Sequence, residues 1–190
     1  DRLSNFPTPV ALMELEGPWK VSFDPQWGGP EEVRFEELED WTKREEEGIR
    51  YYSGIATYRQ AFHLEAEQLE ETGKIYLHLG EVHDMARVIL NGVELGCIWT
   101  APWHIDVTKA IKTGDNLLEI QVANRWPNRL IGDEFKRYDG IKDGEFPEWL
   151  VGDETRNSGR YTYTTLDCYT RESPLLPSGL LGPVLLETTE

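Results

Sequence analysis

Hydrophobic and polar residues alternate one by one over several short stretches of this chain. In the stretch 116–123, Leu118, Ile120 and Val122 fall on one face, and the positions between them are charged or polar. A period of two along the chain is typical of a half-buried β-strand. The same alternation predicts strands in 17–24, 54–64 and 74–80.

Turn residues separate these stretches and indicate how they connect. Asn91 and Gly92 stand between the apolar runs 87–90 and 93–96, and Asn-Gly is a strong hairpin signal because both residues tolerate positive φ. The stretch 33–41 could form a short helix with its apolar residues pointing inward, and 108–114 predicts a helical turn followed by a reversal. Two further short strands are expected at 105–107 and 183–187.

Many short strands broken by Gly, Pro and Asn predict an all-β protein, an antiparallel β-sandwich of the jelly-roll type. Its core is expected to contain Leu77, Leu79, Val88, Leu90, Leu118, Ile120 and Val122. The region 137–177 breaks the pattern, because it is rich in Gly and Pro and has a single regular run at 160–165. We interpret it as a loop-rich insertion, and long loops of this kind are usually functional or partner-facing.

Length and charge narrow the class of protein. A chain of 190 residues fits one domain, 1–190, with enough residues for a real hydrophobic core. The formal net charge of −16 disfavours binding to nucleic acid or insertion into an anionic membrane. We interpret the acidic segments 36–47 and 65–71 as solvated faces rather than sites.

Targeting and cysteine signals are sparse. No stretch approaches the roughly 18 to 20 apolar residues that span a bilayer, and no signal peptide is visible. The first residue is Asp1 rather than Met, which favours a processed or excised piece of a larger protein. Cys97 and Cys168 lack the spacing of a zinc site, and the sequence leaves open whether they form a disulfide.

The segment 124–133 carries the strongest candidate chemistry, because it places polar groups in a loop after a predicted strand. An indole can stack on the C–H face of a sugar, while amides, guanidiniums and carboxylates bond its hydroxyls. The candidate sugar contacts here are Asn124, Trp126, Asn128, Arg129 and Asp133. A structural interpretation competes with this one: Trp126 fills the core, and Arg129 with Asp133 forms an ion pair that fixes the loop.

A second group of candidates, Trp99, Trp103 and His104, precedes the predicted strand 105–107. If that strand pairs antiparallel with 117–123, the start of one lies beside the end of the other. The two groups should therefore converge on one edge of the sandwich and form a carbohydrate site. A lone histidine before a strand is also commonly structural, so His104 keeps both interpretations.

Several segments resemble a known family. Residues 79–92, with their Asn-Gly hairpin, together with 103–108 and 114–117, resemble the sugar-binding β-sandwich of glycoside hydrolase family 2. The flanking segments are similar to the C-terminal region of large bacterial glycosidases, with the α-L-rhamnosidases of glycoside hydrolase family 106 as the nearest group: 27–30, 48–54, 128–133, 158–161 and 173–183. The resemblance covers about residues 15 to 187.

This resemblance implies a galactose-binding-like jelly roll cut from a larger secreted or periplasmic bacterial enzyme of plant or complex polysaccharide breakdown. In that group the catalytic carboxylates lie in a (β/α)₈ barrel, which needs roughly 250 residues, so no catalytic residue is assigned here. No cofactor is expected. A structural calcium ion is possible, as in other such sandwiches, with ligands from the acidic loops 139–143 and 152–154.

Three hypotheses for the function follow. The chain is a non-catalytic accessory domain beside the catalytic domain of its parent enzyme, an independent carbohydrate-binding module, or a docking domain that contacts no sugar. Exposed coplanar rings at Trp99, Trp103 and Trp126 favour sugar binding, whereas buried rings favour docking.

Overall fold

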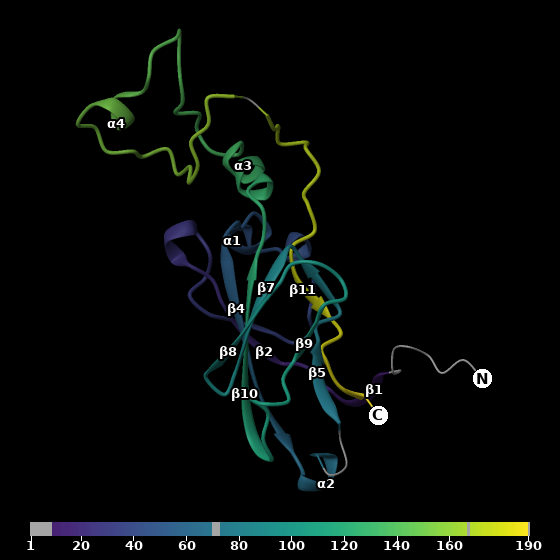
Figure 1. Ribbon diagram of the computed structural model, residues 1–190. Coiled ribbons are helices and arrows are strands. Elements are labelled where there is room, and N and C mark those ends of the chain that lie inside the picture. The colour runs from purple at the N-terminus through teal and green to yellow at the C-terminus, as the bar shows by residue number, and fades with distance from the viewer. Residues whose placement is uncertain (1–8, 70–72, 167, 190) are drawn as a thin grey trace.

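The computed structural model describes residues 9–69, 73–166 and 168–189 (Figure 1). Its larger sheet has the strand order β3–β2–β4–β10–β7–β8, formed by Val33–Phe35, Trp19–Ser22, Ile55–Leu64, Gly114–Ala123, Met85–Leu90 and Val93–Ile98. The second sheet has the order β1–β12–β5–β9, formed by Pro9–Glu14, Leu185–Thr189, Lys74–His78 and His104–Asp106. A small third sheet pairs β11 (Gly179–Gly182) with β6 (Glu81–His83).

One hydrophobic core joins the two large sheets. Leu77 of β5 and Leu186 of β12 belong to the same buried cluster as Leu118 and Ile120 of β10. All named strand pairs are antiparallel, so the fold is the antiparallel β-sandwich that the alternating pattern predicts. Every residue predicted for the core is buried: Leu77, Leu79, Val88, Leu90, Leu118, Ile120 and Val122.

The strand β10 is the centre of the larger sheet and follows the predicted alternation along its whole length. It pairs with β4 from Gly114↔Leu64 to Ala123↔Ile55 and with β7 on its other side. The hairpin β7–β8 turns at Asn91 and Gly92, whose φ angles are 53° and 80°. These positive values confirm the hairpin that the Asn-Gly pair predicts.

The predictions of local structure for 33–41 and 160–165 are wrong. The stretch 33–41 contains the strand β3 and leads into a short 3-10 helix η2 (Trp41–Lys43) instead of forming a helix of its own. Phe35 and Trp41 are nevertheless fully buried, so the inward direction of these side chains is as predicted. The stretch 160–165 contains no strand, because its backbone bonds to Asp133 and Arg156 and not to a neighbouring strand.

Helices are short, and α4 lies apart from the sandwich in the projecting region 137–177 (Figure 1). They are η1 (Pro25–Trp27), η2, α1 (Glu47–Arg50), α2 (Ala66–Leu69), α3 (Pro127–Asp133) and α4 (Glu148–Val151). Figure 1 places α1 and α3 at one end, which we call the α3 end, and α2 at the opposite end.

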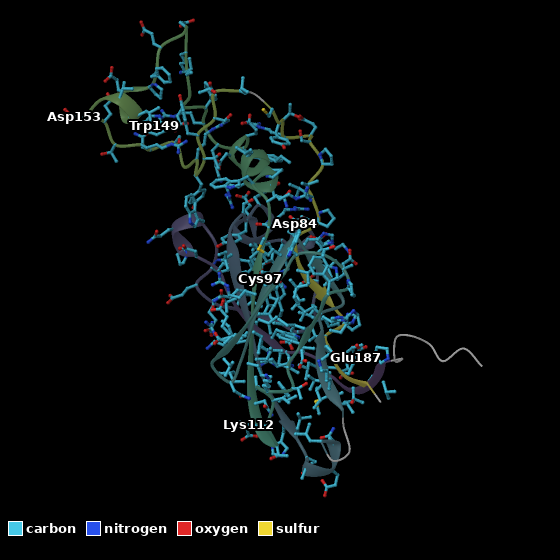
Figure 2. All side chains as sticks on the ribbon, in the orientation of Figure 1. Asp84, Cys97, Lys112, Trp149, Asp153 and Glu187 are labelled. Carbon is cyan, nitrogen blue, oxygen red and sulfur yellow. The ribbon has the colours of Figure 1, made fainter. Side chains whose placement is uncertain are left out.

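The region 137–177, here called the arm, extends beyond the α3 end and returns to the sandwich before β11 (Figure 1). Figure 2 shows Trp149 and Asp153 in the arm, far from Lys112 at the other end of the molecule. Within the arm, Arg156 donates two hydrogen bonds to Asp139 (2.6 and 3.1 Å) and stacks over Trp149 at 4.2 Å. The arm is therefore held in shape by polar and ring contacts of its own.

Candidate functional site

The candidate segment 124–133 begins where β10 ends and turns into the helix α3, so the predicted loop is in fact largely helical. Pro127 occupies the first turn of α3, where its missing N–H leaves no helical bond unmade. Gly132 lets α3 pack closely on Tyr51, the residue that follows α1, since a Cβ atom at this position would lie 2.5 Å from the Cβ of Tyr51. The segment is thus fixed on the α3 end by its own packing.

Asn124 and Asn128 use their amides within the protein. The amide of Asn124 donates to the carbonyl of Tyr52 (2.9 Å) and to Ser178 Oγ (3.0 Å), and accepts from the N–H of Gly54 (3.0 Å). The amide of Asn128 donates to the carbonyl of Leu176 and accepts from its N–H, both at 2.8 Å. These two side chains tie the returning chain before β11 to the sandwich, which is a structural task.

Asp133 is buried and attaches the arm to α3. Its Oδ2 accepts from the N–H of Tyr161 (2.9 Å), the N–H of Thr162 (2.7 Å) and Thr162 Oγ1 (2.6 Å). No ion pair joins Asp133 to Arg129 within 4 Å among the described residues, so the interpretation of these two as a loop-fixing pair is wrong. The carboxylate instead accepts hydrogen bonds from the backbone of the arm.

Arg129 is 5% exposed and forms no ion pair within 4 Å among the described residues, although the charge of the buried Asp133 acts on it. Its guanidinium lies 4.8 Å from the ring centroid of Tyr161, and its Nε and Nη2 have no hydrogen-bond partner within the described ranges. Burial lowers the pKa of Arg129, and the nearby charge of Asp133 only partly opposes that shift.

Trp126 is 54% exposed, so it does not fill the core as the structural interpretation supposed. Its ring meets that of Trp27 edge to face at 5.8 Å between centroids. The next residue, Gly28, has a φ of 79°, and a Cβ atom there would lie 2.6 Å from the hydroxyl of Tyr161. Trp27, Trp126 and Tyr161 thus form one surface, called here the aromatic patch, with Arg129 beneath Tyr161.

The aromatic patch includes two residues that the sequence did not single out as site residues. Trp27 stands in a turn-rich stretch, and Tyr161 falls in the wrongly predicted strand 160–165. The usable signal was Gly28 after Trp27, because a glycine in a left-handed conformation permits close approach of another ring. Nothing in the sequence indicates that Tyr161 is the ring that approaches.

Trp99, Trp103 and His104 also lie toward the α3 end. Ile98 at the end of β8 pairs with Ala86, and Ala86 pairs with Val122 near the end of β10. The predicted pairing of 105–107 with 117–123 is wrong, because β9 pairs with β5 in the other sheet. The group of Trp99, Trp103 and His104 lies at the same end as the segment 124–133 because several strands finish there. Pairing of 105–107 with 117–123 is not the reason.

These three residues are not joined to the aromatic patch by any ring contact in the described part of the chain. Trp99 is 72% exposed, whereas Trp103 is half-buried against the core. The exposed ring of His104 lies 5.4 Å from that of Tyr76. Exposed rings at Trp99, Trp103 and Trp126 would favour sugar binding, and buried rings would favour docking. Trp99 and Trp126 are exposed and Trp103 is half-buried, so the three rings do not decide between the two functions.

Three acidic side chains around α3 pair with basic ones, whereas Asp133 in α3 itself has no basic partner within 4 Å among the described residues. Glu134 pairs with Arg160 at 3.0 Å, and Glu47 pairs with Lys136 at 3.2 Å. Asp84, labelled at the α3 end in Figure 2, pairs with Arg125 at 2.8 Å. These ion pairs fix the carboxylates of Asp84, Glu47 and Glu134 beside α3.

Asp139, one of the acids considered for calcium, accepts bonds from Arg156 and from Ser158. No cluster of three or more candidate metal ligands occurs among the residues that the structure describes. Cys97 and Cys168 are both free and exposed. Within the same ranges, no helix has the length and apolar character needed to cross a membrane.

The known proteins that this chain resembles are glycoside hydrolases or domains of them. Residues 36–161 match the family described as glycosyl hydrolase 2 galactose-binding domain-like. The structure of a rhamnosidase from Novosphingobium sp. PP1Y superposes with a TM-score of 0.79 and 36% identity, covering 99% of this chain and 16% of that one. A Ruminococcus gnavus β-glucuronidase covers 59% of this chain and 20% of that one, with a TM-score of 0.50 and 25% identity.

A curated protein of Formosa agariphila, named "Putative beta-glucuronidase", is 43% identical over 187 residues. The match covers 96% of this chain and 16% of that protein, so this chain spans a small part of the relatives it matches. The resemblance to family 2 sugar-binding sandwiches and to a rhamnosidase is confirmed.

Proposed function

This chain belongs to the glycosyl hydrolase 2 galactose-binding domain-like family, and we propose that it is a non-catalytic accessory domain of a larger glycoside hydrolase. One observation carries the proposal: 99% of the chain superposes on 16% of the Novosphingobium rhamnosidase. A sandwich of this build thus occurs inside a glycosidase more than five times its length. In this role it lies beside the catalytic domain of the parent polypeptide and faces the saccharide with its α3 end.

The substrate that we propose for the parent enzyme is an α-L-rhamnoside in plant or complex polysaccharide, outside the bacterial cytoplasm. The 36% identity to a rhamnosidase supports this choice over the more distant R. gnavus β-glucuronidase. The name of the Formosa relative supports a β-glucuronide instead. Both substrates therefore belong in the test.

The experiment compares this chain alone with the full product of its gene, on aryl α-L-rhamnoside and on aryl β-D-glucuronide. We expect the full product to cleave one of them and this chain to cleave neither. Turnover by this chain that survives repurification and disappears with a single carboxylate substitution would show that the domain is itself catalytic.

The arm provides the contact that we propose with the catalytic domain. Its surface exposes four large apolar side chains: Phe146, Leu150, Val151 and Leu166. Single exposed apolar residues are common, but four on one projecting segment indicate a surface that is covered in the parent protein. Leu150→Asp should therefore lower the activity of the full gene product while the fold of this chain stays intact.

An independent carbohydrate-binding module is the second candidate. The exposed edge-to-face pair of Trp27 and Trp126 favours it, since such rings stack on sugars without help from another domain. Titration of this chain alone with oligosaccharides separates the candidates. Binding in the micromolar range favours the module, whereas binding only in the millimolar range fits an accessory surface that the catalytic domain completes.

A further inference from the structure

Apolar side chains form a row across the solvent face of the larger sheet, toward the α3 end. Ala123 of β10 pairs with Ile55 of β4 on one side and with Met85 of β7 on the other. Trp99 directly follows the last residue of β8, which pairs with β7, and so continues the row beyond Met85. Ile55, Met85 and Trp99 are 56%, 45% and 72% exposed. This apolar row crosses the adjacent strands β4, β10, β7 and β8, which makes it about 14 Å long.

A polar row runs beside the apolar row, two positions away on each strand. Gln121 of β10 pairs with Thr57 of β4 and with Arg87 of β7. Because successive side chains alternate between the two faces of a strand, these groups lie on the same face, about 7 Å from the apolar row. A pyranose presents C–H faces and hydroxyl edges, so a sugar on the apolar row turns its hydroxyls toward the amide, hydroxyl and guanidinium of the polar row.

The charges on this side of the larger sheet cancel in pairs, although the chain as a whole has a net charge of −16. Four cations from four of its strands each lie within 4 Å of an acid: Lys20 of Glu32, Arg34 of Glu36, Arg59 of Glu119 and Arg87 of Glu94. Complementary charge on a ligand and its site favours the right partner, so a balanced face of this kind matches a neutral ligand.

The exposure of the apolar row restricts the shape of the ligand. Side chains that are about half exposed or more line an open surface, where each sugar unit is contacted from one side only. One unit then gains too little to offset the cost of association, and several units in line are needed. A β-1,4-linked chain of equatorial pyranoses is extended and presents its C–H faces in line, whereas an α-1,4-linked chain curves away from such a row.

We propose that the apolar row of Ile55, Ala123, Met85 and Trp99 binds a neutral, extended glycan of the β-1,4-linked type. The inference rests on the accessory role proposed above, and it adds a surface separate from the aromatic patch and the shape of the glycan. Trp99 supplies the stacking ring, and the polar row supplies hydrogen bonds to the hydroxyls.

The test titrates this chain with cellotetraose and with maltotetraose, which contains the same four glucose units in an α-1,4-linked chain. We expect cellotetraose to bind about tenfold more tightly, which is the size of one well-stacked ring contact. Trp99→Ala should remove this preference. Trp126→Ala is the matched control, because this exposed indole belongs to the aromatic patch and should leave the preference unchanged.

NMR spectra show which side chains meet the glycan. The methyl signals of Ile55 and Met85 should move together with the indole N–H signal of Trp99 when cellotetraose is added, and the signal of Trp126 should stay in place. Equal binding of the two tetrasaccharides overturns the inference. So does a loss of binding in Trp126→Ala but not in Trp99→Ala, since the glycan then lies on the aromatic patch.

Binding of neither tetrasaccharide at millimolar concentration also overturns the inference, while cleavage by the full gene product decides the accessory role separately. Oxidation with N-bromosuccinimide, followed by peptide mapping, tests another occupant of the apolar row. Reactive Trp99 in the full gene product supports an open row. Trp99 that is shielded there without sugar is covered by another domain or a second copy, which overturns the inference as well.

Discussion

The sandwich and the arm differ in what holds each of them together. In the sandwich, Trp41 and Tyr58 are fully buried, and their polar atoms bond to each other at 2.5 Å. In the arm, Trp149 is held by its hydrogen bond to the carbonyl of Asp139 and by the guanidinium of Arg156. The sandwich has a buried hydrophobic cluster between its sheets, although rings such as Trp99 and Trp126 stay exposed, whereas no described residue of the arm belongs to that cluster.

The difference concerns the reach of the contacts as well as their chemistry. The core of the sandwich joins strands far apart in the chain, such as β4 and β10. The arm relies on contacts within its own segment, such as Asp139 with Arg156, 17 residues apart, and is attached to α3 through Asp133 and Thr162. A change in the sandwich should therefore affect the whole domain, whereas a change in the arm should stay local.

Leu118→Ala should produce the largest effect. Leu118 is fully buried at the centre of β10, between β4 and β7. Removing its side chain leaves a cavity that well-packed neighbours cannot refill, and we expect the free energy of unfolding to fall by about 2–5 kcal/mol. Urea unfolding followed by far-UV circular dichroism measures the loss.

The control is Leu117→Ala, on the same strand but on the exposed face. It should change the free energy of unfolding by less than about 0.5 kcal/mol. Equal losses in the two variants would contradict the assignment of the faces of β10.

Tyr58→Phe tests the polar part of the core. The Tyr58 hydroxyl accepts from Trp41 Nε1 and from the N–H of Leu180, both buried. Without the hydroxyl these two donors lose their partner, and we expect a loss of about 1–3 kcal/mol in the free energy of unfolding. Differential scanning calorimetry checks it, and an unchanged melting temperature would mean that water replaces the hydroxyl.

The alternating strands were predictable from the sequence, because each strand of the sandwich buries one face and exposes the other. The run 116–123 and the Asn91–Gly92 hairpin carry that information locally. The pairing of 105–107 was not predictable in the same way. In the sequence β9 lies between β8 and β10, which both belong to the larger sheet, but β9 pairs with β5 in the second sheet. The residues of 105–107 alone do not specify this crossing.

The candidate site was predicted only in part. The pattern singled out Trp126 and Arg129, and their contact with a sugar stays a prediction. The structure finds Trp126 exposed and Arg129 buried, with no hydrogen-bond partner for its Nε and Nη2 among the described residues. The residue types of Asn124 and Asn128 do not reveal that both amides are used to hold the chain at 176–178. Whether a polar side chain faces a ligand depends on partners distant in sequence, which residue type alone does not specify.

Arg156→Gln should loosen the arm and leave the sandwich intact. The variant loses the ion pair with Asp139, the bond to the carbonyl of Thr162 and the stacking on Trp149. We expect opening of the arm to become easier by about 1–2 kcal/mol, and the free energy of global unfolding to change little. Limited proteolysis should cut the arm faster, while urea unfolding stays near that of the unmodified chain.

Arg137→Gln is the matched control, because Arg137 is also in the arm but is exposed and, among the described residues, bonds only the side chain of Asn157. It should change proteolysis little. A large drop in global stability for Arg156→Gln would show that the arm and the sandwich unfold as one unit, contrary to the comparison above.

Lowering the pH should weaken the arm through protonation of Asp139, and we expect this effect on stability to be smaller than those of the variants above. Burial alone would raise the pKa of this carboxyl, but the bonds from Arg156 and Ser158 outweigh burial and leave its pKa below the usual 3.8. A lowered pKa in the folded state means that the ionised carboxylate stabilises the arm above about pH 3.8, and that this contribution is lost as the pH falls through the folded-state pKa.

The NMR signals of two indole N–H groups report the outcome, since Trp149 bonds the carbonyl of Asp139 in the arm and Trp41 bonds Tyr58 in the sandwich. Between pH 6 and pH 4 neither signal should move. Below that range the Trp149 signal should shift first, because its carbonyl partner belongs to the residue that becomes protonated. In Asp139→Asn the Trp149 signal should no longer follow the pH. If both signals move together at one pH, acid unfolds the domain as a whole, and the polar contacts of the arm have no stability of their own.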